Sequence, residues 1–529
     1  MVQSYKQNPN LESKYDNIFI GSGMGCLSAA ALLAKEGQKS LILEQHYTPG
    51  GYTHVFKRKG FEWDVGIHYI GEMQREKSAM RKLFDYITDA QLKWADMGEV
   101  YDRILIGDKT YDLVRGVKNF KDQLKTDFPD DTKAIDAYVD LVFKANRTGT
   151  SFYASKAIPP FLNSIAGGLM RRPFLRYADK TTYQVMRELT SNEELIKVLC
   201  GQYGDYGLPP KKSSFIMHAT LVRHYFDGGS FPVGGSSQIV KTIDPIIEKA
   251  GGTILINAEV DHIILEGDKA VGVKMKDGKK IMAEKIVSGT GLVNTYKHLL
   301  SRDVVSRFNL EDQLQKVYPS ASHACLYLGL EGSPEELQLP KTNYWLYPDD
   351  LDHDACVERY LKNIDEDFPV VYISFPASKD PDFQNRYPGK STIDIITLVP
   401  YEQFAKWDGT RWMNRGDEYE ALKDSLTQRL ISKLTELFPQ VKGRIKHSEL
   451  STPLSTKYFT KYETGEIYGL DHSPSRFRQK FLQPRTPINN FYLTGQDIVT
   501  AGIGGALFAG LLTASAMTGK NFMKKIMKS

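Results

Sequence analysis

Cysteine is scarce in this sequence: the chain contains four, and no two of them form a CxxC pair. This pattern argues against a disulfide scaffold or a metal site and fits a reducing compartment. An excess of charge is also lacking, because 68 basic residues against 64 acidic ones leave a net charge of +4, which disfavours nucleic acid as a partner. Residues 1–15 contain no apolar core, so we expect no secretory signal and a cytoplasmic location.

A chain of 529 residues is too long for one compact core, so we expect two or three domains. One run, residues 498–519, carries no charge and is long enough to span a bilayer. Its early glycines and its surplus of Ala, Gly, Thr and Ser favour a helix buried inside a large protein. An integral membrane protein is the alternative.

The stretch DNIFIGSGMGCLSAAALLAKEGQKSLILE, residues 16–44, predicts a strand, a glycine turn, a helix from residue 26 to 35 and a second strand. In such a βαβ unit Gly21 permits the sharp turn, Gly23 allows close approach of a pyrophosphate, and the helix N-terminus attracts that anion. Glu44, which ends the second strand, could accept hydrogen bonds from ribose hydroxyls. The unit is typical of dinucleotide binding. A glycine turn in an ordinary α/β protein is the alternative.

Cys26 stands where the fingerprint G-x-G-x-x-G has its third glycine. That glycine serves close packing of the helix against the strand. Because cysteine is small, we expect the packing to survive.

Further glycine turns and strands follow along the chain. Residues 49–51 form a turn whose bare backbone could pass beneath a phosphate or a flavin ring, and residues 61–69 alternate like a strand. Residues 251–291 predict strands joined by hairpin turns, the last of which ends on a glycine turn at Gly289. A strand within residues 490–497 then leads to Gly495 and Asp497.

The motifs occur in the order GSGMGCLSAA, Glu44, PGG, DVGIHYIG, FPVGGSSQI, VSGTG and YLTGQDIVTAGIGGAL. This set resembles the phytoene desaturase and carotenoid isomerase branch of FAD-dependent amine-oxidase-like proteins, and GIHYIG and LTGQD are most similar to the retinol saturases. The resemblance implies an α/β fold with a Rossmann-like FAD-binding domain and an α+β substrate-binding domain. The first would comprise residues 1–75, 229–300 and 484–529, and the second residues 76–228 and 301–483.

The resemblance also implies one FAD. Its pyrophosphate would lie on the Gly21–Gly25 turn, its adenosine ribose on Glu44 and its adenine at Val260. Gly50, Gly51, Gly495 and Asp497 would bind the phosphate–ribityl portion, although Asp497 could instead cap the helix that follows. Ile503 and Gly504 would meet the flavin ring. The full predicted set is Gly21, Ser22, Gly23, Met24, Gly25, Glu44, Gln45, Gly50, Gly51, Val260, Gly289, Gly495, Asp497, Ile503 and Gly504.

Residues 152–177 mix large apolar side chains with basic ones, and a Pro–Pro pair interrupts them. Apolar residues beside arginines are typical of an interfacial segment, so we expect peripheral contact with a membrane surface. The basic C-terminal tail could add a second contact, and a helical hairpin buried in the substrate domain is the alternative. The basic residues of the segment are Lys156, Arg171, Arg172 and Arg176.

The implied activity is reduction of a carbon–carbon double bond in a retinoid, a carotenoid or a related polyene lipid. Reduced flavin would deliver a hydride, and a protein acid would protonate the other carbon. We choose His68 for that acid, although a histidine is as often structural. The alternatives are a desaturase or isomerase, and a non-enzymatic prenyl-lipid-binding protein of the GDP-dissociation-inhibitor type. Because only one dinucleotide fingerprint is complete, NAD(P)H would have to visit transiently, or another electron donor must serve.

Overall fold

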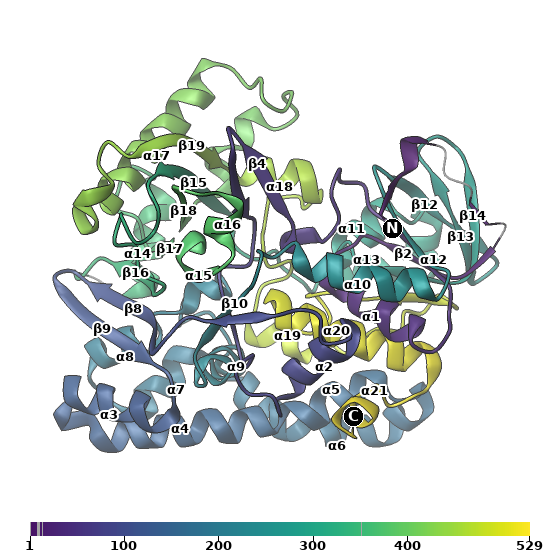
Figure 1. Ribbon diagram of the computed structural model, residues 1–529. Helices are drawn as coiled ribbons and strands as arrows, with labels where there is room; N and C mark the ends of the chain where they lie inside the picture. Colours follow the sequence, from purple (N-terminus) through teal and green to yellow (C-terminus); the bar gives the residue numbers. More distant parts are fainter. Residues whose placement is uncertain (1, 8–10, 13, 351, 529) are drawn as a thin grey trace.

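The computed structural model describes residues 2–7, 11–12, 14–350 and 352–528, which build two large sheets and a layer of helices (Figure 1). The first sheet has the strand order β1-β11-β3-β2-β14-β13-β12, with β20 paired to β14. Its strands are β1 (Gln3–Ser4), β2 (Lys14–Ile20), β3 (Ser40–Leu43), β11 (Thr253–Ile256), β12 (Val260–Glu266), β13 (Lys269–Met275), β14 (Lys280–Ser288) and β20 (Phe491–Leu493). The β12–β13–β14 meander is antiparallel and the other pairs are parallel.

Helix α1 (Met24–Ala34) lies between this sheet and helix α20 (Gly502–Thr518), and every one of its residues is buried. Its run of Ala and Leu suits that position, because a helix buried on all sides needs no polar face. The βαβ prediction is confirmed, and the helix begins two residues earlier than expected, directly after Gly23. Helix α10 (Gln238–Lys249) also packs on α1.

The second sheet has the order β19-β15-β18-β17-β16-β8-β9 and is antiparallel except for the β16–β8 pair. Leu426, Leu430 and Leu434 of α17 recur every fourth residue and pack in the hydrophobic cluster of this sheet. Its strands are β8 (Val100–Ile106), β9 (Lys109–Val114), β15 (His323–Glu331), β16 (Asn343–Tyr347), β17 (Val371–Ser374), β18 (Lys390–Leu398) and β19 (Ile445–Ser451), and α17 spans Asp417–Leu437.

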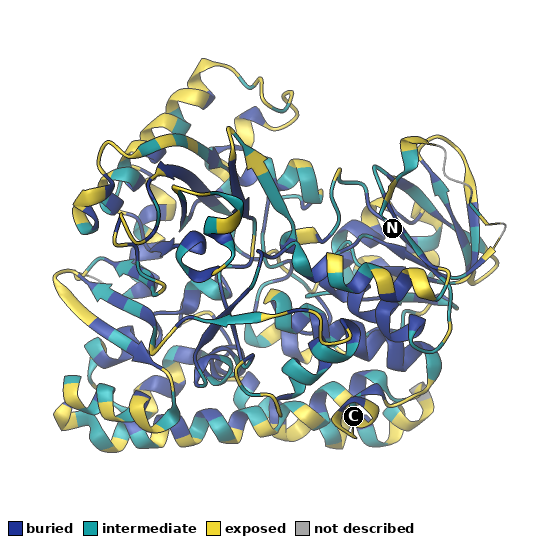
Figure 2. Ribbon diagram, in the orientation of Figure 1, coloured by how far each residue is buried: buried dark blue, intermediate teal, exposed yellow. Residues whose placement is uncertain are grey.

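A row of helices runs along the lower edge of the molecule in Figure 1, and much of its outer side is exposed in Figure 2. It contains α3 (Val117–Asp127), α4 (Thr132–Arg147), α5 (Gly149–Ala157) and α6 (Pro160–Ala178). The other helices are α2 (Ala79–Ile87), α7 (Thr182–Leu189), α8 (Glu193–Leu199), α9 (Phe215–Tyr225), α11 (Leu292–His298), α12 (Arg302–Arg307), α13 (Leu310–Leu314), α14 (His353–Lys362), α15 (Pro376–Lys379), α16 (Phe383–Arg386), α18 (Pro453–Thr460), α19 (Pro474–Arg478) and α21 (Phe522–Lys528).

Two smaller features connect the parts of the chain that carry the two large sheets. The hairpin of β4 (Val55–Arg58) and β5 (Phe61–Asp64) lies against the second sheet, where the Trp63 indole N–H donates to Leu328 O at 3.0 Å. A three-stranded sheet joins β6 (Ile70–Gly71) and β10 (Gly229–Pro232) to β7 (Trp94–Asp96). The strand expected over residues 61–69 therefore ends at Asp64, and residues 65–69 connect the hairpin to β6.

The charge-free run forms α20, which begins at Gly502 rather than at residue 498. A methyl group on Gly510 would lie 2.5 Å from Gly25 O, so α20 crosses α1 at backbone contact, and the Ser28 hydroxyl donates to Leu507 O. No single helix of the described residues is long and apolar enough to cross a membrane. Only the pair α20 and α21, bent by 116°, meets that test together.

Cys26 replaces the third fingerprint glycine without loss of packing, because another glycine makes room for it. Its side chain is buried and its thiol lies 3.8 Å from Ile20 O. A methyl group on Gly289, at the end of the neighbouring strand β14, would overlap the Cys26 Sγ atom. The missing glycine is thus compensated from the opposite side of the contact.

This compensation predicts a coupled effect on stability. Gly289→Ala should lower the free energy of unfolding by about 1–3 kcal/mol through overpacking. In a Cys26→Gly background the same change should cost far less, since its other neighbours lie at 3.4 Å or beyond. Denaturant unfolding of the four proteins of this cycle measures the coupling, and additive effects would contradict it.

Candidate functional site

A cavity of about 1050 Å³ is lined by residues of both large sheets. This volume reaches the top of the range of about 300–1,000 Å³ that ligand pockets usually have, so the cavity has room for a ligand larger than an ordinary metabolite. Part of its wall comes from the turn after β2, the end of β3 and residues 258–261. Another part carries Asp205, Trp345, Val370 and Tyr372.

The glycine turn after β2 presents bare backbone to the cavity. Gly23 caps α1, and a methyl group on it would meet no atom within 4 Å, so the space beside it is open. A methyl group on Gly51 would lie 3.0 Å from Gly23 Cα, and one on Gly25 would lie 2.6 Å from Gly495 N. Three predicted glycine segments thus meet at the free N–H groups of a helix start, which is the arrangement that binds a phosphate.

Glu44 lies beside this turn and is buried. Its Oε2 accepts hydrogen bonds from the backbone N–H and the hydroxyl of Ser22 at 2.9 and 2.6 Å, and its Oε1 accepts one from His46 N at 2.8 Å. A carboxylate has about four acceptor sites, so capacity remains for a ribose hydroxyl. Gln45 and Val260 also line the cavity, and the Gln45 amide donates to Phe459 O.

Asp497 does not cap the helix that follows it, because α20 starts only at Gly502. Its Oδ2 accepts a hydrogen bond from Leu292 N, the first residue of α11, at 2.7 Å, and its Oδ1 accepts one from Leu470 N at 3.1 Å. Arg476, which the sequence reading missed, is buried beside it and donates to the Gln496 and Asp497 carbonyls. Asp497 and Arg476 therefore hold the turn that carries Gly495.

The other predicted residues divide into two groups. Met24, Gly50, Gly289 and Ile503 line the cavity. Gly504 does not: a methyl group on it would lie 2.6 Å from Met80 Cε, so it faces α2. Gly502 lines the cavity in its place.

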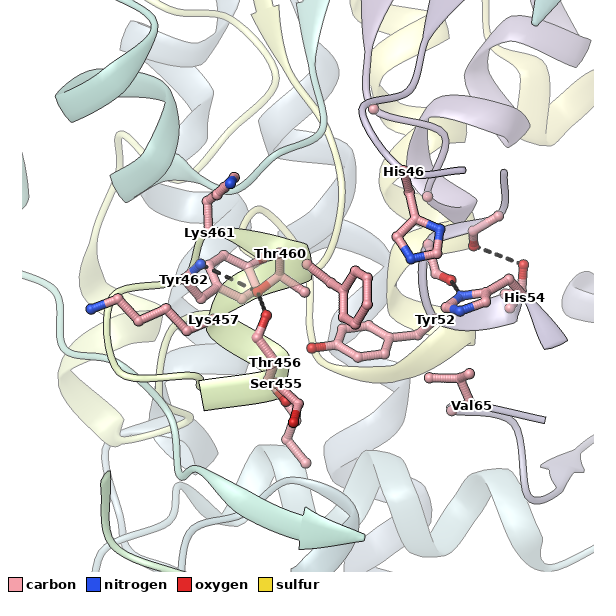
Figure 3. Close-up of a pocket in the computed structure, with 18 of the residues that line it drawn as sticks. His46, Tyr52, His54, Val65, Ser455, Thr456, Lys457, Thr460, Lys461 and Tyr462 are labelled. Carbon is pink, nitrogen blue, oxygen red and sulfur yellow. Dashed lines mark hydrogen bonds between the residues drawn. The ribbon is translucent and has the colours of Figure 1, made fainter. Parts of the chain in front are cut away.

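Several buried polar atoms of the cavity wall have no hydrogen-bond partner within the described part of the chain. Tyr52 OH and Thr494 Oγ1 are two of them. Figure 3 shows the Tyr52 ring between His54 and the α18 residues Thr456 and Thr460. Because buried polar groups are nearly always paired, such atoms gathered at one cavity indicate a ligand that completes their bonds. Tyr52 follows directly after the PGG turn, a position that the sequence reading passed over.

His68 lines another part of the cavity, with its Nδ1 3.3 Å from Asp394 Oδ2 on β18. Burial raises the pKa of Asp394, and the nearby His68 and Lys379 oppose the rise. Burial also lowers the pKa of Lys379 to about 7. The Lys379 ammonium donates to the His68 carbonyl at 2.9 Å and to Ser374 Oγ at 2.7 Å.

These features fit FAD. The open space at Gly23, the helix start and the remaining acceptors of Glu44 suit a pyrophosphate and a ribose, and the unpaired wall atoms suit a polar ring system. Within the described residues, no three His, Cys, Asp or Glu side chains gather as they would around a metal ion.

The sequence pattern of the family "Flavin containing amine oxidoreductase" matches residues 25–518. The chain belongs to this family. It is 37% identical to all-trans-retinol 13,14-reductase of zebrafish over 96% of this chain and 86% of that protein. An inactive all-trans-retinol 13,14-reductase of zebrafish is 33% identical over 98% and 89%. Prolycopene isomerase of Arabidopsis thaliana is 25% identical over 97% and 84%.

Solved structures of this fold include cyclohexylamine oxidase from Brevibacterium oxydans, with a TM-score of 0.60 at 15% identity over 97% of this chain and 99% of that one. A Rab GDI from Plasmodium falciparum has a TM-score of 0.51 at 13% identity over 96% and 99%. The predicted α/β fold is confirmed. The same fold thus occurs in an oxidase and in a GDI.

Glu44 gives a direct test of FAD binding. Glu44→Gln keeps the side-chain shape but removes the charge from its bonds to the ribose, so the Kd for FAD should rise ten- to a hundredfold, about 1.5–3 kcal/mol. Glu284→Gln, on an exposed residue of the same sheet, is the matched control. Titration of the apoprotein followed by flavin fluorescence measures both, and an unchanged Kd for Glu44→Gln would refute the assignment.

Proposed function

We propose that the protein is an FAD-dependent oxidoreductase that saturates a carbon–carbon double bond of a retinoid, a carotenoid or a related polyene lipid. The observation that carries the proposal is one continuous cavity. It joins the glycine turn at the start of α1 to a wall that contains Trp345, Val370, Tyr372 and Leu398. Such a wall suits a long apolar substrate. The identity to retinol reductases over nearly the whole chain supports the same reading.

Bound FAD would supply hydride chemistry once reduced. The protein's own residues would do the rest: Gly21–Gly25 and Gly495 would bind the diphosphate, Glu44 would fix the ribose, and the aromatic wall would hold the polyene and exclude water. The reaction also needs a proton for the second carbon. Two cavity residues with exchangeable protons are His68 and Asp205. NAD(P)H would reduce the flavin in a transient visit, or another donor would serve.

Two other functions are compatible with the same fold and cavity. An isomerase or desaturase would use the same cavity, and the likeness to prolycopene isomerase favours it as the second candidate. A lipid-binding protein of the GDI type would need no flavin, so this function would not explain the open space beside Gly23.

The function is tested anaerobically on the purified protein. We expect a yellow protein whose photoreduced flavin is reoxidised rapidly by one of three additions: all-trans-retinol, a carotene or another polyene. The product should gain two hydrogens by mass spectrometry. A rearranged product of unchanged mass would favour the isomerase. A colourless protein that gains no visible absorbance with added FAD would favour the binding protein.

Peripheral membrane contact through residues 152–177 stays part of the proposal, with one correction. The segment forms α5 and α6, and Phe161, Ile165 and Leu169 make an exposed apolar stripe on α6, with 73, 69 and 72% of their surfaces accessible. Lys156 and Arg171 are buried instead, since the Lys156 ammonium donates to Ile498 O and the Arg171 Nε to Ser155 Oγ. The basic residues left to meet anionic headgroups are Arg172 and Arg176, which are exposed.

Vesicle binding should therefore depend on α6. Replacing Phe161 and Leu169 with Gln should weaken binding to neutral and anionic vesicles alike, because both lose apolar area. Replacing Arg172 and Arg176 with Glu should weaken binding only to anionic vesicles, and most at low salt. Leu361→Gln, at an exposed leucine of α14, is the control in a flotation assay. Equal binding by all variants would refute the contact.

A further inference from the structure

A chain of three side chains connects the cavity to the interior of the substrate domain. The Tyr69 hydroxyl lies 2.9 Å from Asp102 Oδ2 and 2.9 Å from Asp205 Oδ2. Asp205 follows α8 in sequence and lines the cavity, whereas Asp102 lies on β8 and is fully buried. The three residues come from three separate segments of the chain, so the fold rather than local sequence brings them together.

Counting hydrogens shows which carboxyl holds a proton. A phenol has one hydrogen, so Tyr69 can donate to only one of its two partners. Asp102 also accepts hydrogen bonds from Gln202 Nε2 at 2.6 Å and from Asn343 Nδ2 at 2.9 Å, which stabilise its ionised form. Two ionised carboxylates cannot both accept from the single Tyr69 hydrogen. Asp205 must therefore be the partner that donates, and it needs a proton of its own to do so.

The surroundings of Asp205 agree with this count. Burial and the charge of nearby Asp102 raise the pKa of Asp205 well above its usual range. Burial raises the pKa of Asp102 too, but hydrogen bonds from Asn343, Tyr69 and Gln202 oppose it. Within the described residues, no basic side chain forms an ion pair with Asp205. Besides Asp102, the titratable groups near enough to be affected by the charge of Asp205 include Tyr225, Tyr372 and Tyr468.

We propose that Asp205 is the catalytic acid of the reduction, and that Tyr69 and Asp102 are positioning residues that keep Asp205 protonated at the cavity wall. This rests on the proposed function, which supplies the polyene and the reduced flavin. In the step, bound reduced flavin would supply a hydride, with its two electrons, to one carbon of the double bond. Asp205 gives a proton to the other carbon and becomes a carboxylate, and water later returns the proton. The substrate thus gains two hydrogens and the flavin is oxidised.

This assignment differs from the choice of His68 made from the sequence. His68 Nδ1 lies 3.3 Å from Asp394 Oδ2, but neither atom has a hydrogen-bond partner within the described residues, so no count of hydrogens assigns a proton to His68. Asp205 lines the cavity, and its side chain is hydrogen-bonded to Tyr69. The two candidates lie on different elements and can be changed separately.

The first measurement needs no substrate. Infrared spectroscopy of the flavin-loaded protein at pH 7 should show a protonated carboxyl band that Asp205→Asn removes. Tyr69→Phe should shift the frequency of the same band, because the Asp205 carboxyl loses its hydrogen-bond partner. A variant that only destabilised the fold would not shift this band selectively. A spectrum of Asp205→Asn that retains the wild-type carboxyl band would overturn the proposal.

The second measurement is anaerobic reoxidation of the photoreduced flavin, normalised to bound FAD. Asp205→Asn keeps the size of the side chain and should slow reoxidation by the polyene about 10²–10⁴-fold. Reoxidation by ferricyanide, which needs no protein acid, should be unchanged. If His68→Phe shows the slow rate and Asp205→Asn the wild-type rate, His68 is the acid and the proposal fails. If no polyene reoxidises the wild type, the proposed function fails, and the infrared band still decides whether Asp205 is protonated.

Discussion

Close backbone contact between distant segments is the constraint on which the rest of the structure depends. Gly25 meets Gly495, Gly51 meets Gly23, and Gly510 of α20 meets the carbonyl of Gly25. Methyl groups at these positions would lie 2.5 to 3.0 Å from backbone atoms, so no other residue fits without movement. Because these contacts tie the beginning of the chain to its end, the turn at the start of α1 is fixed from two sides, and a ligand there meets N–H groups rather than side chains.

The second large sheet becomes part of the site through residues 55–71. This segment places the β4–β5 hairpin against the second sheet and ends in β6, a strand of the three-stranded sheet. His68 and Tyr69 lie on its last part, and their side chains reach different carboxyls, Asp394 of β18 and Asp102 of β8. Adjacent residues of an extended chain point to opposite sides, so one short segment supplies two separate polar contacts.

Local patterns predicted the βαβ unit and its glycine turn well, and they predicted the polar contacts of the other part of the cavity poorly. Residues 16–44 carry a fixed spacing of strand, glycine turn and acid, because a phosphate imposes that spacing on any chain. No comparable rule links Asp205, Tyr69 and Asp102, since their neighbourhood arises from tertiary packing alone. The burial of Arg171 was misjudged for a similar reason: its partner Ser155 lies on the adjacent helix α5. The end of strand β5 at Asp64 could not be predicted from the sequence either. The Asp64 carboxylate accepts a hydrogen bond from Ser236 N at 2.6 Å, and Ser236 lies far away in the sequence.

The way in which buried charge is balanced favours an enzyme over a lipid-binding protein. Asp102, Asp205 and Asp394 lie at or behind an apolar wall, where an unpaired charge is costly. A fixed arginine beside each would hold the carboxyl ionised and useless as an acid. Instead, the groups beside them are a phenol, amides, a histidine and Lys379, whose pKa is lowered to about 7. Groups that can gain or lose a proton, rather than permanent cations, therefore surround these carboxyls. A protein that only carried a lipid would gain from replacing such carboxyls with apolar side chains, whereas a reductase that must protonate carbon needs them.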